Sequence, residues 1–345
     1  IGRNKQGLTN TMARNQKPVK RSKYRVYTRF YTNIVDAIIK SKGGSQPHLR
    51  NTRGWASLKG VVEAGILPVS ELMAPINCSI LAAEAQWERS ELPAIFVQQK
   101  DINNMMSGKF TINKLPELLT PFKAFTLCLP ADFSIKGIKP GGVLVATYPD
   151  EYNYADCLKQ TLGKLNLGDD LLHPPQDVKN IMTLAYTAPD GGHCVASHHG
   201  EALITILNSK NFTEFKSLVK PIKNMNWYDS ELNDEEMELQ YAIFKLVLSI
   251  SVYTMAKDNA IKEGFPPVKG FALDRPFGEE VASYSLITSF QQHASPKEHY
   301  RSWHIRQLVH EKFYQGDYAT LPPNSRFVFV DDAIVNGKSS PKYID

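Results

Sequence analysis

Histidine, arginine and aromatic side chains gather near the end of the sequence, between His299 and Val335. This stretch holds three histidines, three arginines, one tryptophan and six phenylalanine or tyrosine rings. Imidazole groups transfer protons near neutral pH, and guanidinium groups bind carboxylates or phosphates through paired hydrogen bonds. Cations interleaved with rings also form hot spots in protein interfaces and stack on nucleic-acid bases. The composition therefore suits either catalysis or recognition.

A catalytic interpretation uses the histidines as the acid and base in the cleavage of RNA. His299, His304 and His310 would supply the two proton-transfer groups, and Arg301 or Arg306 would hold the phosphate. This chemistry needs no metal ion. A metal-independent ribonuclease is therefore one alternative function.

A recognition interpretation instead presents the same side chains to another macromolecule, and we favour it for this stretch. An added peptide strand on an exposed sheet edge is one physically reasonable mode. The residues that we expect at or beside the binding surface carry cationic, aromatic or amide groups, and they are Arg301, Trp303, His304, Arg306, Tyr314, Gln315 and Arg326.

Two β-compatible runs would position these side chains. In the run Tyr300–Leu308, a period of two places His304 and Arg306 on the same face. The apolar residues of this run also fit a helical stripe, so the alternation leaves the type of element open. The run Arg326–Val330 has the sequence RFVFV and follows a Pro-Pro-Asn turn, which predicts a strand.

A second cluster of potential metal ligands lies in the sequence GHCVASHHG, which joins β-rich runs at residues 181–187 and 201–207. Adjacent histidines rarely reach one tetrahedral zinc ion together, and no second Cys/His pair lies nearby. Nothing marks the cysteine as an activated nucleophile. We interpret the segment as a polar turn and expect no metal. The side chains concerned are His193, Cys194, His198 and His199.

The net charge of +5 is unevenly distributed. Residues 1–30 carry nine Lys or Arg side chains, and the first acidic residue is Asp36. Residues 1–29 are therefore predicted to form a mobile basic arm, which either contacts RNA or DNA phosphates in a salt-dependent manner or is merely solvated. The cations that would contact phosphate are Lys17, Lys20, Arg21, Lys23 and Arg25.

Patterns along the chain predict an α+β fold. Residues 30–90 are predicted to be helical, and residues 91–228 hold short β-rich runs that suggest a mixed, mostly antiparallel sheet. Residues 229–345 contain a long helix and the C-terminal recognition segment. The helix, Asn233–Lys257, has an acidic first turn and apolar residues on most sides, which predicts a buried core helix.

Composition also sets limits on cofactors and location. The four cysteines never form a CxxC pair, which indicates a reduced, cytosolic protein without structural disulfides. We expect neither a signal peptide nor a membrane span. The sequence contains neither a Walker A nor a GxGxxG motif, so no nucleotide cofactor is expected.

A short motif and the order of elements around it carry a resemblance to a known family. The long helix is followed by KGF at residues 269–271 and then by the recognition segment. The residues that carry the motif are His304, Ile305, Arg306, Phe313, Tyr314, Gln315, Gly316, the RFVFV run and Asn336. In these features the chain resembles the anti-CRISPR VA-two family, phage and mobile-element proteins that antagonise the type V-A CRISPR effector nuclease.

The resemblance implies a non-catalytic inhibitor that acts in the cytoplasm of the bacterial host. Such a protein recognises a segment of the nascent effector polypeptide, and the message that encodes the effector is lost. The expected partner is therefore a bacterial effector protein or its nascent chain. The basic N-terminal segment adds RNA or the ribosome as a further expected partner, and an RNA- or DNA-binding phage accessory protein is the main alternative.

Overall fold

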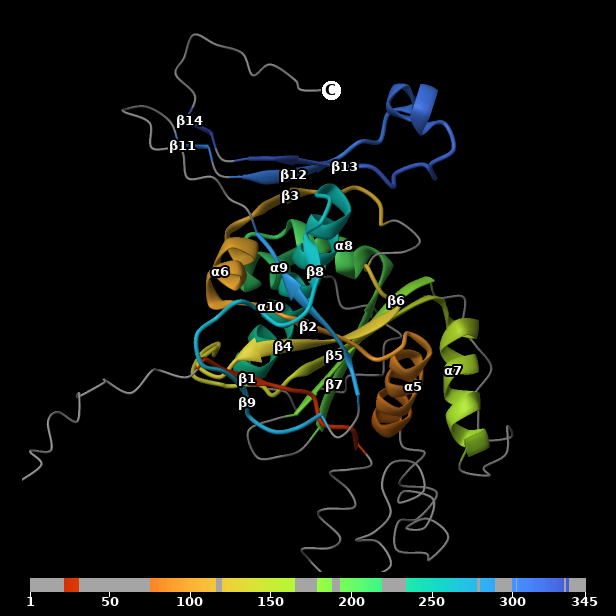
Figure 1. Cartoon of the computed structure of the whole chain (residues 1–345). Coiled ribbons are helices and arrows are strands. Elements are labelled where there is room, and N and C mark those ends of the chain that lie inside the picture. Colours follow the sequence, from red (N-terminus) through yellow and green to blue (C-terminus); the bar gives the residue numbers. More distant parts are fainter. Residues whose placement is uncertain are drawn as a thin grey trace, which may run out of the picture.

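Four layers of secondary structure make up the described part of the chain (Figure 1). A small sheet lies at the top of the view, and the helices α6, α8 and α10 separate it from a large sheet. The helices α5 and α7 pack on the other face of the large sheet. The structure is a computed structural model that describes residues 22–30, 75–115, 120–164, 179–187, 193–218, 234–277, 280–288, 300–301, 303–331 and 333–334.

The large sheet has nine strands in the order β7-β6-β5-β4-β2-β10-β8, with β1 paired to both β4 and β9. Strands β4 to β7 form an antiparallel meander, while β2 runs parallel to β4 and β10. The predicted α+β class with a mixed sheet is thus confirmed. The strands are β1 Ser22–Arg25, β2 Pro93–Phe96, β4 Ala124–Pro130, β5 Val143–Asp150, β6 Lys179–Thr187, β7 His193–His199, β8 Ile261–Glu263, β9 Phe271–Leu273 and β10 Ala282–Leu286.

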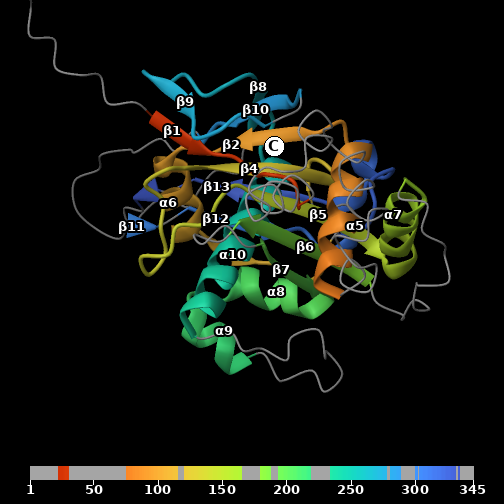
Figure 2. The same ribbon diagram turned by 90° about the horizontal axis from the view of Figure 1, so that it is seen from below.

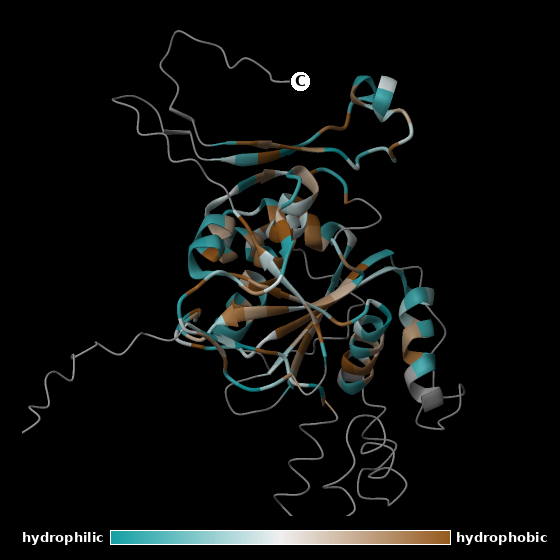
Figure 3. Cartoon of the chain, in the orientation of Figure 1, coloured by the Kyte–Doolittle hydropathy of each residue, from teal (hydrophilic) through white to brown (hydrophobic). Residues whose placement is uncertain are grey.

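Alternation along the strands divides the interior into two faces, and hydrophobic residues follow these strands (Figure 3). In β4, Phe125, Leu127 and Leu129 point toward α10. Ala124 and Cys128 point to the opposite face. Seen from below, α5 and α7 lie beside β5 and β6 at one end of the sheet, and β1, β8 and β9 lie at the other end (Figure 2).

The helices begin where their sequences provide suitable first turns. Helix α5 begins at Pro75, where the missing amide hydrogen costs no intrahelical bond. Helix α7 follows Asp150, whose Oδ1 accepts a hydrogen bond from the Asn153 amide at 2.9 Å. The described helices are α5 Pro75–Arg89, α6 Gln99–Ser107, α7 Glu151–Lys164, α8 Gly200–Asn208, α9 Phe212–Leu218 and α10 Asp234–Ala256.

Helix α10 is the central element of the fold, and the prediction of a helix over Asn233–Lys257 is confirmed to within one residue at each end. Every residue from Leu239 to Tyr253 is buried. By length and composition this helix could cross a membrane, but 83% of its most apolar window is buried inside the protein. It therefore serves as a core helix covered from both sides.

The small sheet covers the side of α10 that faces away from the large sheet. Its strands have the order β13-β12-β3, with β12 antiparallel to β13 and parallel to β3. The Phe329 ring packs edge-on against Tyr253 of α10, with ring centres 5.4 Å apart. The elements of this layer are β3 Lys109–Thr111, β11 Tyr300–Arg301, β12 His304–Gln307, η3 Glu311–Tyr314, η4 Gly316–Tyr318, β13 Phe327–Val330 and β14 Ala333–Ile334.

Two local predictions in the middle of the chain are wrong. The histidine-rich segment that we predicted as a polar turn is strand β7, and the β-rich run at residues 201–207 is helix α8. The change occurs at Gly200, whose φ of 47° lies in the left-handed region. Leu203, Ile206 and Leu207 then bury one side of the helix. Short apolar runs fit both periodicities, and packing decides between them.

Residues 22–29 are part of the fold rather than of a mobile arm. Strand β1 pairs in parallel with β9 and in antiparallel with β4, and Tyr27 and Arg29 are buried. Strands β8 to β10 come from the predicted C-terminal division, so residues 91–228 do not form the sheet alone. Lys17, Lys20 and Arg21 lie outside the described residues, as does most of the predicted helical region 30–90.

Arg25 has a structural role that excludes the predicted phosphate contact. Its side chain is 9% exposed and donates to the carbonyl oxygens of Pro130 at 2.8 Å, of Phe133 and of Pro140. Unpaired carbonyls in the interior are costly, so the guanidinium group fastens β1 to the loops after β4. Lys23, two residues earlier, is exposed.

We expect Arg25→Leu to lower the free energy of unfolding by about 3 kcal/mol, because the buried carbonyls of Phe133 and Pro140 lose their donor, while that of Pro130 keeps the Phe133 amide. Lys23→Leu is the matched control, since it removes the same charge from the same strand and should change stability by less than about 0.5 kcal/mol. Urea unfolding of both variants measures the difference. Equal losses would show that Arg25 has no special structural role.

Candidate recognition surface

The small sheet has one face toward α10 and one toward solvent. Ile305 and Gln307 are buried on the inner face, whereas Arg306 between them is exposed. The predicted alternation with a period of two is therefore confirmed, and His304 and Arg306 share the outer face. Residues opposite one another in the three strands define this outer face, which consists of Lys109, Thr111, His304, Arg306, Val328 and Val330.

Arg306 and Lys109 provide positive charge on the outer face. Neither forms an ion pair with another described residue. Arg306 lies directly across from Val328, whose side chain is 37% exposed. A guanidinium group beside an exposed apolar side chain suits a partner that offers a carboxylate next to an apolar group.

The connection between β12 and β13, residues 308–326, adds apolar surface beside the outer face. Val309, Tyr318 and Leu321 are 48%, 46% and 41% exposed. Together with Val328, they are half of the eight large hydrophobic side chains that are exposed in the described part of the chain. We call residues 308–326 the tip. Apolar exposure concentrated in one segment marks an interaction site more often than scattered single residues do.

Internal contacts of Tyr314 and Arg326 hold the tip in shape. The Tyr314 hydroxyl donates to the Leu308 carbonyl at 2.7 Å and accepts from the Arg326 amide at 3.2 Å. The Arg326 guanidinium lies 3.4 Å from the Tyr318 ring centre and donates to the Phe313 carbonyl. These two predicted binding residues therefore brace the tip, and their polar groups are used inside the protein.

Trp303 also differs from its predicted place at the surface, because its side chain is 5% exposed. Its ring packs against Phe110 and Phe329, with both pairs of ring centres 5.7 Å apart. A Cβ atom at Gly108 would overlap this ring, so glycine is required there for the close approach. Trp303 therefore anchors the small sheet rather than contacting a partner.

The other predicted binding residues fall in three places. Gln315 is exposed in the tip, next to η4. Arg301 lies in β11, opposite Ala333 of β14. His304 is half-buried on the outer face. Gln307 was not among the predicted binding residues. Its Oε1 atom accepts hydrogen bonds from the amides of Asn113 and Lys114, which follow β3, and its Nε2 atom donates to the carbonyls of Lys114 and Asn324.

The candidate catalytic histidines lie on different elements. His304 is the first residue of β12, whereas His310 lies beyond the end of that strand and immediately before η3. The Nδ1 atom of His310 accepts a hydrogen bond from the Lys312 amide and begins η3. His299 lies outside the described residues. The ribonuclease alternative therefore stays a prediction, and the hydrogen bond that His310 accepts serves to begin η3.

Neighbouring side chains of strand β7 point to opposite faces of the large sheet, so His193 and His198 also lie on opposite faces. His198 faces α10, where its ring lies 4.6 Å from that of Phe244. His193 packs on the other face, and its Nε2 atom lies 3.1 Å from the Thr28 carbonyl. Among the described residues, no group of three His, Cys, Asp or Glu side chains could hold a metal ion.

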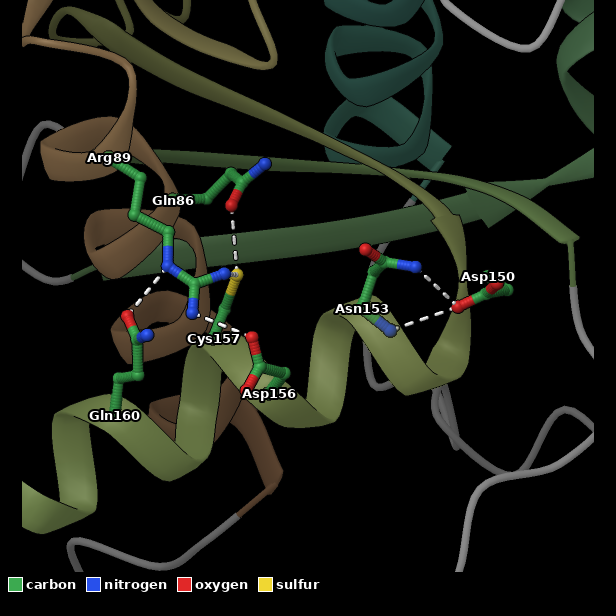
Figure 4. A network of polar contacts seen from close by, with 7 residues as sticks. All are labelled: Gln86, Arg89, Asp150, Asn153, Asp156, Cys157 and Gln160. Atoms are coloured by element: carbon green, nitrogen blue, oxygen red, sulfur yellow. Dashed lines mark hydrogen bonds and ion pairs between the residues drawn. The ribbon is translucent and has the colours of Figure 1, made fainter.

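The polar network between α5 and α7 does not activate its cysteine (Figure 4). Arg89 donates to Gln160, Asp156 and the Cys157 sulfur at 2.6, 2.7 and 3.1 Å. The thiol donates to Gln86 at 2.9 Å. Burial raises the pKa of Cys157 to about 11, so the group stays a thiol at neutral pH. The network joins two helices and offers no nucleophile.

Lys245 is a buried cation that the sequence shows only as an interruption in the apolar surface of α10. Its side chain is 3% exposed, and its Nζ atom donates to the carbonyls of Leu207 and Ser209 at the end of α8. Burial lowers its pKa to about 8. The amine satisfies carbonyls that the helix leaves without partners, so this role is also structural.

Comparison with known protein families, curated proteins and solved structures finds no match for this chain. Any function assigned to it must therefore rest on the geometry of its own surfaces and on the C-terminal motif. That geometry leaves the outer face and the tip as the exposed parts of the segment that the sequence singled out.

His198, which packs against α10, makes stability depend on pH. Burial against Phe244 lowers its pKa from 6.5 to about 4. The folded protein thus keeps the neutral form, and its stabilising contribution is full above pH 6.5 and is lost as the pH falls toward 4. We expect urea unfolding to show a loss of up to about 3 kcal/mol from this group over that range.

His198→Gln removes this titration and should flatten the dependence of unfolding free energy on pH. The exposed Gln315 supplies the control, because Gln315→Asn removes no titrating group and should leave the slope unchanged. Part of the slope should persist in His198→Gln, since burial also lowers the pKa of His193 and His199. An unchanged slope in His198→Gln would show that His198 titrates normally.

Proposed function

We propose that the protein is an anti-defence factor that binds a segment of a bacterial effector polypeptide through the outer face and the tip, and thereby suppresses production of the effector. The observation that carries the proposal is the exposed Arg306 beside Val328, on a sheet whose other face is anchored to α10. A rigid support lowers the entropy that a binding surface loses when its partner arrives.

The character of this surface favours polypeptide over nucleic acid. The tip exposes the apolar side chains of Val309, Tyr318 and Leu321, and it carries the acidic residues Glu311 and Asp317 together with the cation Lys312. Those carboxylates would repel a phosphate backbone. The ring best placed for stacking on bases, Tyr318, already has Arg326 over it. A polypeptide segment can bind without contacting these carboxylates and without stacking on the Tyr318 ring.

The chemistry of the outer face describes the segment that it would accept. Arg306 suits a carboxylate, which a guanidinium group binds through two parallel hydrogen bonds. Val328, together with Leu321 and Val309 of the tip, suits aliphatic or aromatic side chains next to that carboxylate. We therefore propose an acidic-apolar segment as the ligand.

The resemblance of the C-terminal motif to the anti-CRISPR VA-two family supplies the identity of the partner. His304 and Arg306 of that motif both lie on the outer face, and Gln315 is exposed in the tip. Packing of the core does not require particular residues at these solvent-facing positions of the motif. Their presence therefore supports a role in binding. The proposed partner is the type V-A effector nuclease, recognised as its chain emerges from the ribosome.

The direct test uses stalled ribosome complexes that display successive segments of a type V-A effector. At least one segment should bind the full-length protein, and Arg306→Glu should weaken that binding at least about tenfold, the loss of a modest hot spot. Lys139→Glu, at an exposed lysine outside the surface, makes the same change of charge and should bind as the unaltered protein does. Failure of the unaltered protein to bind any segment would overturn the proposal.

A further inference from the structure

We propose a second interaction surface, built around Phe265, that binds single-stranded nucleic acid by stacking a base on this ring and contacting phosphates through neighbouring lysines. It is formed by β1, β8, β9 and the loop at residues 264–270, and it uses none of the residues of the outer face or the tip. It does not depend on the function proposed above.

Aromatic rings, rather than a helix, cover this end of the large sheet. Helix α5 packs on β4 to β7. Beyond it, Phe96 of β2 contacts Phe265 and Phe271 at ring-centre distances of 5.3 and 5.5 Å. Phe96 faces away from α10, because its neighbour Ile95 belongs to the core around that helix. The rings that make up this cluster are Tyr24, Phe96, Phe265, Phe271 and Phe277.

Phe265 is the member of this cluster that reaches solvent. Its side chain is 53% exposed, although the ring lies 4.7 Å from that of Phe271. The loop that carries it is stiff: Pro266 and Pro267 follow it, and the Val268 amide donates to the Pro266 carbonyl at 2.7 Å. A fixed, exposed ring loses little entropy when a base stacks on it.

Two exposed lysines belong to the elements that surround the ring. In the ladder of β8, β10 and β2, Lys262 lies across from Ser285, which lies beside Phe96, so Lys262 emerges on the face of Phe96. Lys269 is exposed in the loop that carries Phe265. Neither lysine forms an ion pair with a described residue. Both can therefore contact phosphates without breaking an existing interaction.

The charge of the adjoining sequence also favours a polyanion. The Ser22 amide donates to the Gly270 carbonyl at 3.0 Å, which fixes the start of β1 beside Lys269. The residues that precede Ser22 carry six Lys or Arg side chains and no Asp or Glu. Cations in this part of the sequence attract a polyanion. An apolar peptide would gain nothing from them.

Phe265 with two lysines matches the way that single strands are held, by stacking of bases and by contacts with the backbone. A duplex offers no free base face along its length, so it should bind more weakly than a single strand. Fluorescence anisotropy with labelled oligouridylate and oligothymidylate, with the full chain at low salt, measures the affinity. Binding of either oligonucleotide, with a lower affinity for the matched duplex, is the expected result.

Variants assign the binding to this surface. Phe265→Ala should weaken binding about tenfold, the loss of one stacked base, while Phe265→Trp should retain it. Tyr152, which is 70% exposed on α7, provides the matched aromatic control, and Tyr152→Ala should bind normally. The double change Lys262→Gln and Lys269→Gln should reduce the slope of log affinity against log salt by about 1.4.

Three results would overturn the proposal. The first is that neither oligonucleotide binds at low salt. The second is that Phe265→Ala binds with the same affinity as the unaltered protein, when thermal unfolding shows that both proteins are folded. The third is that the protein fails to bind oligonucleotides but sediments with phosphatidylserine vesicles, and that this sedimentation requires Phe265. The surface would then bind a membrane. Arg306→Glu should leave oligonucleotide binding intact, so this test fails or succeeds separately from that of the polypeptide-binding function.

Discussion

The burial of α10 on nearly all sides is the constraint on which the rest of the structure depends. A helix that is apolar around most of its circumference needs cover from more than one layer. The large sheet supplies that cover on one side, and β12 and β13 supply it on the other through Ile305, Phe327 and Phe329. Because strand side chains alternate, burying these residues forces Arg306 and Val328 outward. The candidate recognition surface is thus a geometric consequence of closing the core.

The same constraint explains why the most conspicuous side chains of the C-terminal segment are structural. A three-stranded sheet of this size has little surface with which to hold itself on a helix, so large rings provide the contact area. Trp303 fills the space above Gly108, while Tyr314 and Arg326 close the tip with hydrogen bonds to backbone groups. Aromatic and cationic composition therefore drew attention to the segment, but it did not separate the residues that hold the small sheet and the tip in place from those that lie on the outer face.

Local patterns predicted the long apolar element of the core. Helix α10 was foreseen to within one residue at each end, because an apolar run of this length that follows an acidic first turn fits only a helix. Strand β7 was not, since its half-buried histidines look like turn residues in the sequence. Strand β1 was missed for a different reason. Its partner β9 lies almost 250 residues away, and the carbonyls that hold Arg25 come from a loop more than 100 residues away. No local window contains that information.

The two surfaces proposed for this protein are separated by the large sheet itself. Ile95 and Phe96 are consecutive residues of β2, and they point into the core around α10 and into the aromatic cluster behind Phe265. The small sheet packs on the α10 side, whereas Phe265 lies on the other. A polypeptide on the outer face and a single strand at Phe265 would therefore occupy opposite sides of one rigid layer, without competing for any side chain. The two proposed ligands would thus use different side chains, so neither would have to displace the other.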